Sequence, residues 1–268
     1  MVPGPRRQDR LDPGRLRRPP VRANVQPLIP DRGTAHRGMS VMADRSGYFA
    51  PGFFEFFRDL GKNNRKEWFE ANKPRYEEVV QEPAVRFVRD ASTRLKKISP
   101  HLVGEAKAYG GSISRIYRDI RFSPDKSPYK THVGIHFWHD QATTPEHMAP
   151  GYFLHLESGE SGVHSGVWHP DPPVLKKIRD RIVEEPDSWK KVLRSRIELS
   201  GESFKRPPPG YDPNHPMIQD LRRKDFVAGH RFRDNEVVNP KFLDEFVKAC
   251  EAMDPLNAFL AKSIGLPW

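Results

Sequence analysis

Strict alternation of apolar and polar residues in the middle of the chain constrains the fold more than any other feature. Residues 133–137 place Val, Ile and Phe at every second position, and residues 152–156 place Tyr, Leu and Leu in the same way. Successive side chains of a strand point to opposite faces, so each segment predicts a strand with one buried face. After the Ser-Gly-Glu turn at 158–160, residues 163–168 predict the hairpin partner of the second strand. Residues 112–118 favour a further strand that runs into a turn.

Helical periodicity comes before this region. Residues 51–99 repeat apolar side chains at helical spacing, and their prolines and glycines divide them into three predicted helices. Asn64 and Glu67 have the spacing of a capping box at the start of the second helix. Pro74 predicts a kink or a break within that helix, because proline lacks the N–H that the helix needs.

Helical spacing returns after residue 172, where two helices are expected before a long irregular loop at 201–216. A last strand is predicted at 225–232. A long helix follows from Asn239 onward, with Asp254-Pro255 starting a separate final helical piece. This order predicts a single α+β domain, an antiparallel sheet flanked by N-terminal and C-terminal helices.

The net charge of +10 is concentrated in one part of the chain. Residues 1–38 hold nine Arg, no Lys and three Asp, a net charge of +6, so the rest of the chain carries only +4. Seven prolines and little apolar periodicity predict that residues 1–45 form a disordered Arg/Pro-rich tail and that the folded domain spans 46–268. Three interpretations of the tail stay open: a basic nucleic-acid arm, an organelle-targeting peptide, and upstream sequence before a start at Met39 or Met42.

Composition excludes several classes of protein. The chain has no apolar run long enough to span a bilayer and no apolar signal-peptide core. Its single cysteine, Cys250, lies in an apolar helical pattern, which excludes an internal disulfide and predicts a buried thiol in a reducing compartment. The motifs of zinc proteases, thiol–disulfide enzymes, nucleotide-binding loops and serine hydrolases are absent. We therefore expect a soluble, cytoplasmic protein with no membrane association and no cofactor, and whether it is an enzyme stays open.

The segment from Arg115 to His132, RIYRDIRFSPDKSPYKTH, is the densest in chemical groups. It carries five Arg or Lys side chains and one His against two Asp, and two Ser-Pro pairs predict turns. Arginine offers planar bidentate donors for phosphate or carboxylate, and a proline-stiffened turn presents its side chains at little entropic cost. We predict a site for a small anionic ligand here, formed by Arg115, Arg118, Arg121, Lys126, Ser127, Tyr129, Lys130 and Asn64.

Asp119 is the candidate catalytic residue of this segment, either as a base or as the group that orients an arginine. A competing interpretation treats Arg118-Asp119 and Asp125-Lys126 as surface ion pairs of a charged loop, each contributing little to stability. A third interpretation is a non-catalytic module that binds nucleic acid or a protein partner through the same basic surface. Aromatic residues interleave with the cations there and suit base stacking, but a charge of only +4 outside the tail makes nucleic acid the weaker choice.

No metal site is expected from the histidines. His132, His136 and His139 are spaced like metal ligands, but residues four apart on a strand are separated by about 13 Å, too far to share one ion. A cross-strand cluster of His136, His155 and His164 stays open if their strands are adjacent.

Two stretches carry a resemblance to a known family: FFEFFRDLGKNNRKEWFEANKPRY at 53–76 and the 115–132 segment, followed by GVHSGVWHP at 162–170. They resemble the bacterial and fungal family known as domain of unknown function 2461, over about residues 49–262. The resemblance implies a cytoplasmic protein that starts near Met39 or Met42, and it assigns no reaction. The family pattern falls on Asn64, Trp68, Phe69, Asn72, Tyr76, Arg118, Asp119, Arg121, Phe122, Asp125, Lys126, Pro128, Tyr129 and Lys130.

Overall fold

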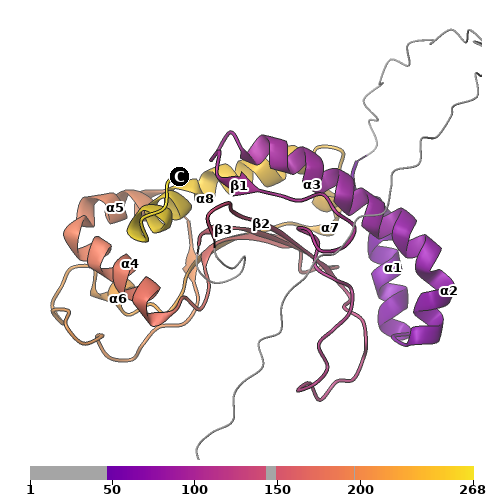
Figure 1. Ribbon diagram of the computed structural model, residues 1–268, viewed down its shortest axis with the longest axis horizontal. Helices are drawn as coiled ribbons and strands as arrows, with labels where there is room; N and C mark the ends of the chain where they lie inside the picture. Colours follow the sequence, from indigo (N-terminus) through magenta and orange to yellow (C-terminus); the bar gives the residue numbers. More distant parts are fainter. Residues whose placement is uncertain (1–46, 143–148, 196) are drawn as a thin grey trace, which may run out of the picture. The chain divides into compact units, whose positions relative to one another are not determined.

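The computed structural model describes residues 47–142, 149–195 and 197–268 (Figure 1). It confirms the predicted fold class, an α+β domain with an antiparallel sheet flanked by N-terminal and C-terminal helices. The predicted disordered tail, 1–45, lies outside the described residues. None of the helices in the described part of the chain has the length and apolar character needed to cross a membrane.

The N-terminal helices follow one another closely. Their bounds are α1 (Pro51–Lys62), α2 (Lys66–Tyr76), the π-helical turn η1 (Glu77–Gln81) and α3 (Glu82–Leu95). Pro74 lies inside α2, and the chain passes from α2 through η1 into α3 without a break. Of the kink or break predicted at Pro74, a break is therefore excluded, and the single π-helical turn that follows is a place where helices commonly kink.

The described strands form a six-stranded sheet in the order β1-β2-β3-β4-β6-β5, with antiparallel neighbours throughout. Their bounds are β1 (Leu102–Val103), β2 (Val133–His139), β3 (Gly151–Leu156), β4 (Gly162–Val167), β5 (Leu199–Ser200) and β6 (Phe226–Arg231). The long central strands are those that alternation predicts. The two-residue strands β1 and β5 are too short to carry any periodicity, so the sequence does not indicate them.

The predicted strand at 112–118 is wrong as a regular strand. Ile113 pairs with Ile135 and Tyr117 pairs with Tyr129, each as an isolated bridge. The segment therefore pairs with β2 only at Ile135, on the same edge of β2 as β1. It then leaves the sheet to form the charged turn. Glycines in front of it and the Ser-Pro pairs after it keep the ladder from extending.

The C-terminal half supplies α4 (Pro172–Glu184), α5 (Pro186–Arg194), α6 (Ile218–Leu221), α7 (Asp234–Val237) and α8 (Phe242–Ser263). The prediction of a separate helical piece at Asp254-Pro255 is wrong, because Pro255 lies inside the continuous helix α8. Met253, Leu256 and Leu260 are buried on either side of it. Packing against the sheet along the whole helix offsets the hydrogen bond that the proline removes.

The two faces of the sheet differ. Helices α3 and α8 lie side by side over one face (Figure 1), where Ile135, Leu154 and Val163 are fully buried. The opposite face carries partly exposed histidine and aromatic side chains separated by glycines. A Cβ added to Gly134 would lie 2.7 Å from the Phe153 ring, and one added to Gly166, where φ is +112°, would lie 1.9 Å from a backbone oxygen. Glycine is therefore required at both positions, because a ring lies against the first and a backbone oxygen against the second. We call this second face of the sheet the open face.

Asn257 of α8 fixes the helix to the sheet, and its replacement should lower stability. Its Nδ2 donates to the Gly151 carbonyl at 3.2 Å, and its Oδ1 accepts from the buried Ser165 hydroxyl at 2.9 Å. Asn257→Ala leaves that hydroxyl without a partner, so we expect the free energy of unfolding to fall by about 2 kcal/mol in urea titrations. Asn235→Ala, at an exposed asparagine, is the control and should change it by less than about 0.5 kcal/mol.

Candidate functional site

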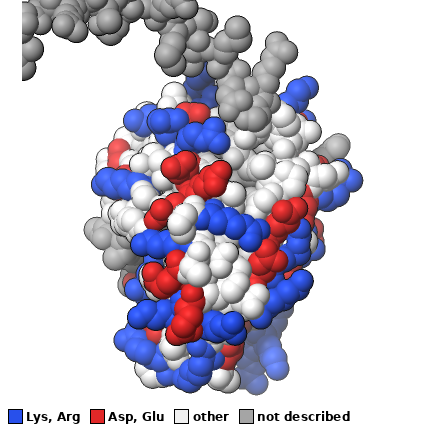
Figure 2. All heavy atoms as spheres, turned by 90° about the vertical axis from the view of Figure 1, so that its right-hand side faces the viewer, with Lys and Arg blue, Asp and Glu red and all other residues white. Residues whose placement is uncertain are grey.

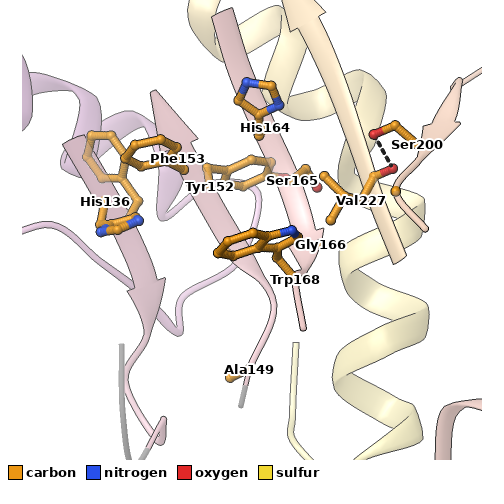
Figure 3. Close-up of a pocket in the computed structure, with 13 residues that line it drawn as sticks. His136, Ala149, Tyr152, Phe153, His164, Ser165, Gly166, Trp168, Ser200 and Val227 are labelled. Carbon is orange, nitrogen blue, oxygen red and sulfur yellow. Dashed lines mark hydrogen bonds between the residues drawn. The ribbon is translucent and has the colours of Figure 1, made fainter. Parts of the chain in front are cut away.

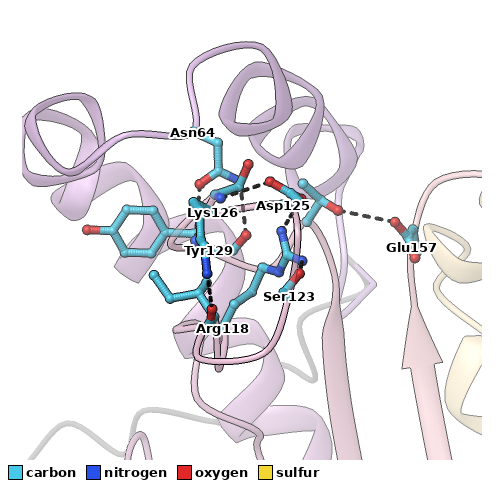
Figure 4. A network of polar contacts seen from close by, with 10 residues as sticks. Asn64, Arg118, Ser123, Asp125, Lys126, Tyr129 and Glu157 are labelled. Carbon is cyan, nitrogen blue, oxygen red and sulfur yellow. Dashed lines mark hydrogen bonds and ion pairs between the residues drawn. The ribbon is translucent and has the colours of Figure 1, made fainter.

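The charged turn at 115–132 is attached to the linker between α1 and α2 by the side chain of Asn64 (Figure 4). Its Nδ2 donates to the Tyr129 carbonyl at 2.9 Å, and the Tyr129 N–H donates to its Oδ1 at 3.0 Å. The Tyr129 ring stacks on Phe69 of α2, with 4.3 Å between ring centroids. The capping box predicted for Asn64 and Glu67 is therefore wrong, since the amide that would cap the helix binds Tyr129, and Arg65 takes the N-cap position.

A cavity of about 540 Å³ lies between this linker and the turn. It brings together six of the residues predicted as site residues, Asn64, Arg118, Asp119, Ser127, Tyr129 and Lys130. Gly61, Asp125, Thr131 and His132 complete its lining. The Asn64 amide serves to hold the turn, and the Arg118 guanidinium and the Lys130 ammonium are the cationic groups of the lining.

Arg118 is held at the wall of the cavity by two partners. Its Nη1 donates to the Asp125 carboxylate in a short ion pair, and its Nη2 donates to the Ser123 hydroxyl at 3.3 Å. Hydrogen bonds from Ser127, followed by the Arg118 interaction, hold the pKa of Asp125 well below its usual range. The Asp125 carboxylate is therefore ionised, and at 59% exposure it is open to solvent.

Asp119 is paired with Arg121 in the same turn. The Arg121 Nη2 donates to Oδ2 at 2.6 Å, and Nε donates to Oδ1 at 3.0 Å. These hydrogen bonds lower the pKa of Asp119. A carboxylate held in its ionised form is a weak proton acceptor, so the contacts favour the orienting role for Asp119 over the role of a base.

Three predicted ligand residues do not line the cavity. The Arg121 side chain is 75% exposed beside Asp119. Lys126 donates from Nζ to the Ile120 carbonyl at 2.9 Å, which closes the turn, and Arg115 is exposed. On the side of the domain that carries α1 and α2, Lys and Arg alternate with Asp and Glu over the surface, without a broad area of one sign (Figure 2). The ion pairs of the turn are Arg118 with Asp125 and Arg121 with Asp119, so the competing interpretation named the wrong partners. Of these cations Arg118 lines the cavity, together with Lys130.

Sequence reasoning missed the imidazole and carboxylate groups next to this cavity. His132, at its rim, lies beside His155 with 4.6 Å between ring centroids, and the His155 Nε2 is 2.9 Å from Oε2 of Glu157. Burial and the neighbouring His155 lower the pKa of His132. The alternation of the two strands is visible in the sequence. The register of β2 against β3, which places these side chains on one face, is known only from the structure.

The cross-strand cluster of His136, His155 and His164, which the sequence left open, does not form. Register places Phe153 directly between His136 and His164, two strands apart, as Figure 3 shows. In the described residues these three imidazoles are not among the groups whose ligand atoms lie within 4.8 Å of one another. His139 points to the buried face.

A second cavity, of about 490 Å³, lies on the open face of the sheet (Figure 3). Its walls are largely apolar, with Phe153, Trp168 and Val227 alongside the imidazoles of His136 and His164. Glycines of β3 and β4 also line it. Glycines alternating with His and Phe on the central strands were the only sequence signal for it.

Removing the Asn64 side chain should loosen the turn without unfolding the domain. In Asn64→Ala the Tyr129 N–H and carbonyl lose their partners, so we expect the free energy of unfolding to fall by about 1–2 kcal/mol and amide exchange to speed up at Tyr129. Asn72→Ala is the matched control, because the Asn72 amide bonds only to the Trp68 carbonyl of its own helix. Equal exchange at Tyr129 in both variants would contradict the anchoring role.

Comparison with protein-family models matches residues 52–259 to the family described as conserved hypothetical protein, DUF2461. The match covers α1 through most of α8 and includes both cavities. Searches of curated proteins and of solved structures returned no match.

Proposed function

The chain belongs to the family described as domain of unknown function 2461, and we propose that its cavity beside Asn64 binds a small anion through a phosphate or carboxylate group. The observation that carries the proposal is the position and the pairing of the Arg118 guanidinium. Its guanidinium is fixed at the cavity wall and pairs with a solvent-exposed carboxylate, that of Asp125. A ligand carboxylate or phosphate can take the place of Asp125 without reorganising the arginine.

The rest of the cavity supports the same chemistry. Lys130 adds a second cation to the lining. The turn is held to α2 by the Asn64 amide and the Tyr129 stacking contact, so few groups need to be ordered when a ligand binds. Asp119, held by Arg121, contributes to the shape of the turn in this proposal.

Opposite charge changes at Arg118 and Asp125 provide the test. Arg118→Gln should weaken binding of inorganic phosphate, pyrophosphate or a dicarboxylate by about tenfold or more, because a charge-assisted hydrogen bond contributes about 1.5–3 kcal/mol. Asp125→Asn should strengthen binding, since it removes the competing charge while its Oδ1 still accepts from the Ser127 N–H. Isothermal titration calorimetry measures both affinities.

Arg233→Gln is the control for net charge, because Arg233 is exposed and paired with Glu236 away from the cavity. It should leave the affinity within about twofold of wild type. An Asp125→Asn protein that binds no more tightly than wild type, together with an unaffected Arg118→Gln protein, would rule out the cavity as the anion site.

A second candidate function is a module that binds nucleic acid or a protein partner at the tip of the turn. Phe122 is 94% exposed, and the Arg121 guanidinium carbon lies 5.8 Å from its ring centroid. An exposed aromatic ring next to a cation is suited to base stacking and phosphate contact. The mixed charge of the surface in Figure 2 supports a local contact over a broad nucleic-acid face.

Phe122→Ala separates this function from the anion cavity. Stacking contributes about 1–3 kcal/mol per base, so single-stranded oligonucleotide binding, measured by fluorescence anisotropy, should weaken by about fivefold or more. Phosphate binding should be unchanged in the same variant. Binding that is insensitive to both Phe122→Ala and salt concentration would argue against polynucleotide contact.

Cytoplasmic location and the domain boundary at residue 46 remain part of the proposal. The single, buried Cys250 supports the location, because proteins of oxidising compartments commonly pair their cysteines in disulfides. The family match from residue 52 onward supports the boundary.

A further inference from the structure

Three side chains with metal-binding atoms meet at one end of the β2–β3 ladder. Val133 pairs with Leu156, and Gly134 pairs with His155. One position further along, His132 therefore lies opposite Glu157, on the same face as His155. The three side chains therefore meet at the end of the ladder.

The distances suit a shared ion. The ligand atoms of His132, His155 and Glu157 all lie within 4.8 Å of one another. Oε2 of Glu157 is 2.9 Å from the His155 Nε2 and 3.8 Å from the His132 Nδ1. With ligand bonds of about 2.0–2.2 Å, two atoms on one ion lie between about 3 Å apart, at right angles, and about 4.4 Å apart. Small side-chain rotations bring all three into range.

Glu157 is held in place by contacts outside the cluster. The Thr131 hydroxyl donates to Oε1 at 3.2 Å, so Oε2 is the oxygen that faces the imidazoles. Its backbone N–H donates to the Ser161 hydroxyl at 3.1 Å, and that hydroxyl donates to its carbonyl at 2.8 Å. Ligating carboxylates are oriented by such neighbouring hydrogen bonds.

A second group in the described residues, of two histidines and one aspartate, is less suited to an ion because one of its histidines already uses both ring nitrogens. His101, His139 and Asp140 also bring their ligand atoms within 4.8 Å of one another. The buried His139 uses both ring nitrogens, because Nε2 bonds the Pro267 carbonyl at 2.7 Å and Nδ1 accepts from the Gln141 N–H at 3.1 Å. It has no lone pair left for an ion.

We infer that His132, His155 and Glu157 bind one divalent transition-metal ion through two imidazole nitrogens and one carboxylate oxygen. This donor set suits Zn²⁺, Fe²⁺, Co²⁺ or Ni²⁺ better than Mg²⁺ or Ca²⁺, which prefer oxygen ligands alone. Three protein ligands leave coordination positions for water or for an anionic group in the adjoining cavity, which His132 also lines. The inference does not depend on anion binding, since the ion is held by the protein alone.

The test is metal titration of the full chain in phosphate-free buffer, with Co²⁺ followed by its absorption spectrum and Zn²⁺ by calorimetry. Wild-type protein should bind one equivalent of each, with a visible Co²⁺ spectrum typical of nitrogen and oxygen ligands. His132→Gln, His155→Gln and Glu157→Gln should each weaken the affinity by at least about tenfold. His136→Gln and His164→Gln, at histidines of the same sheet face, are the matched controls and should bind as wild type.

Circular dichroism checks that each variant is folded. Glu157→Gln keeps an acceptor for the Thr131 hydroxyl, so it tests the site even where a histidine variant fails to fold. The absence of stoichiometric binding in wild type would overturn the inference. So would equal binding by wild type and Glu157→Gln, because the cluster would then be a hydrogen-bonded His–Glu pair only. Inorganic phosphate added in a separate titration shows whether an anion joins the ion, without affecting either outcome.

Discussion

The register of β2 against β3 is the constraint on which the rest of the structure depends. Pairing of Val133 with Leu156 places one set of side chains beneath α3 and α8 and the other on the open face. A shift by one residue would move His155 into the core and expose Leu154, at a large cost in buried apolar surface. Burial of apolar side chains on one face fixes the register. The register in turn decides which polar side chains lie next to one another on the other face.

The charged turn follows from the same sheet but is stabilised differently. Its two acidic residues neutralise arginines locally, and Lys126 closes the backbone, so most of the charge that stands out in the sequence is used within the turn. The Asn64 amide then fixes the turn against α2. Cations of a flexible loop lose entropy when they bind a ligand, whereas Arg118 is already ordered.

Two cavities and a pair of histidines lie along β2. The cavity lined by Arg118 and Lys130 lies at one end of β2, and the largely apolar cavity lies along the other half of this strand. His132 and His155 lie at the border of the cavity with the two cations. Gly134 and Gly166 are required on this face by close contacts with the Phe153 ring and with a backbone oxygen.

The sequence by itself determined the fold class, the long strands and most helices, because burial of one face imposes a period that can be counted. It also located the charged turn, since Ser-Pro turns and clustered cations are local features. It failed at Pro255, Asn64 and residues 112–118, where packing against distant residues outweighed local preference. Only the tertiary structure separated the cavity residues Arg118 and Lys130 from the exposed Arg121, and only it brought His132 to His155 and Glu157. Both depend on strand register and on contacts between residues far apart in the chain, which no local pattern encodes.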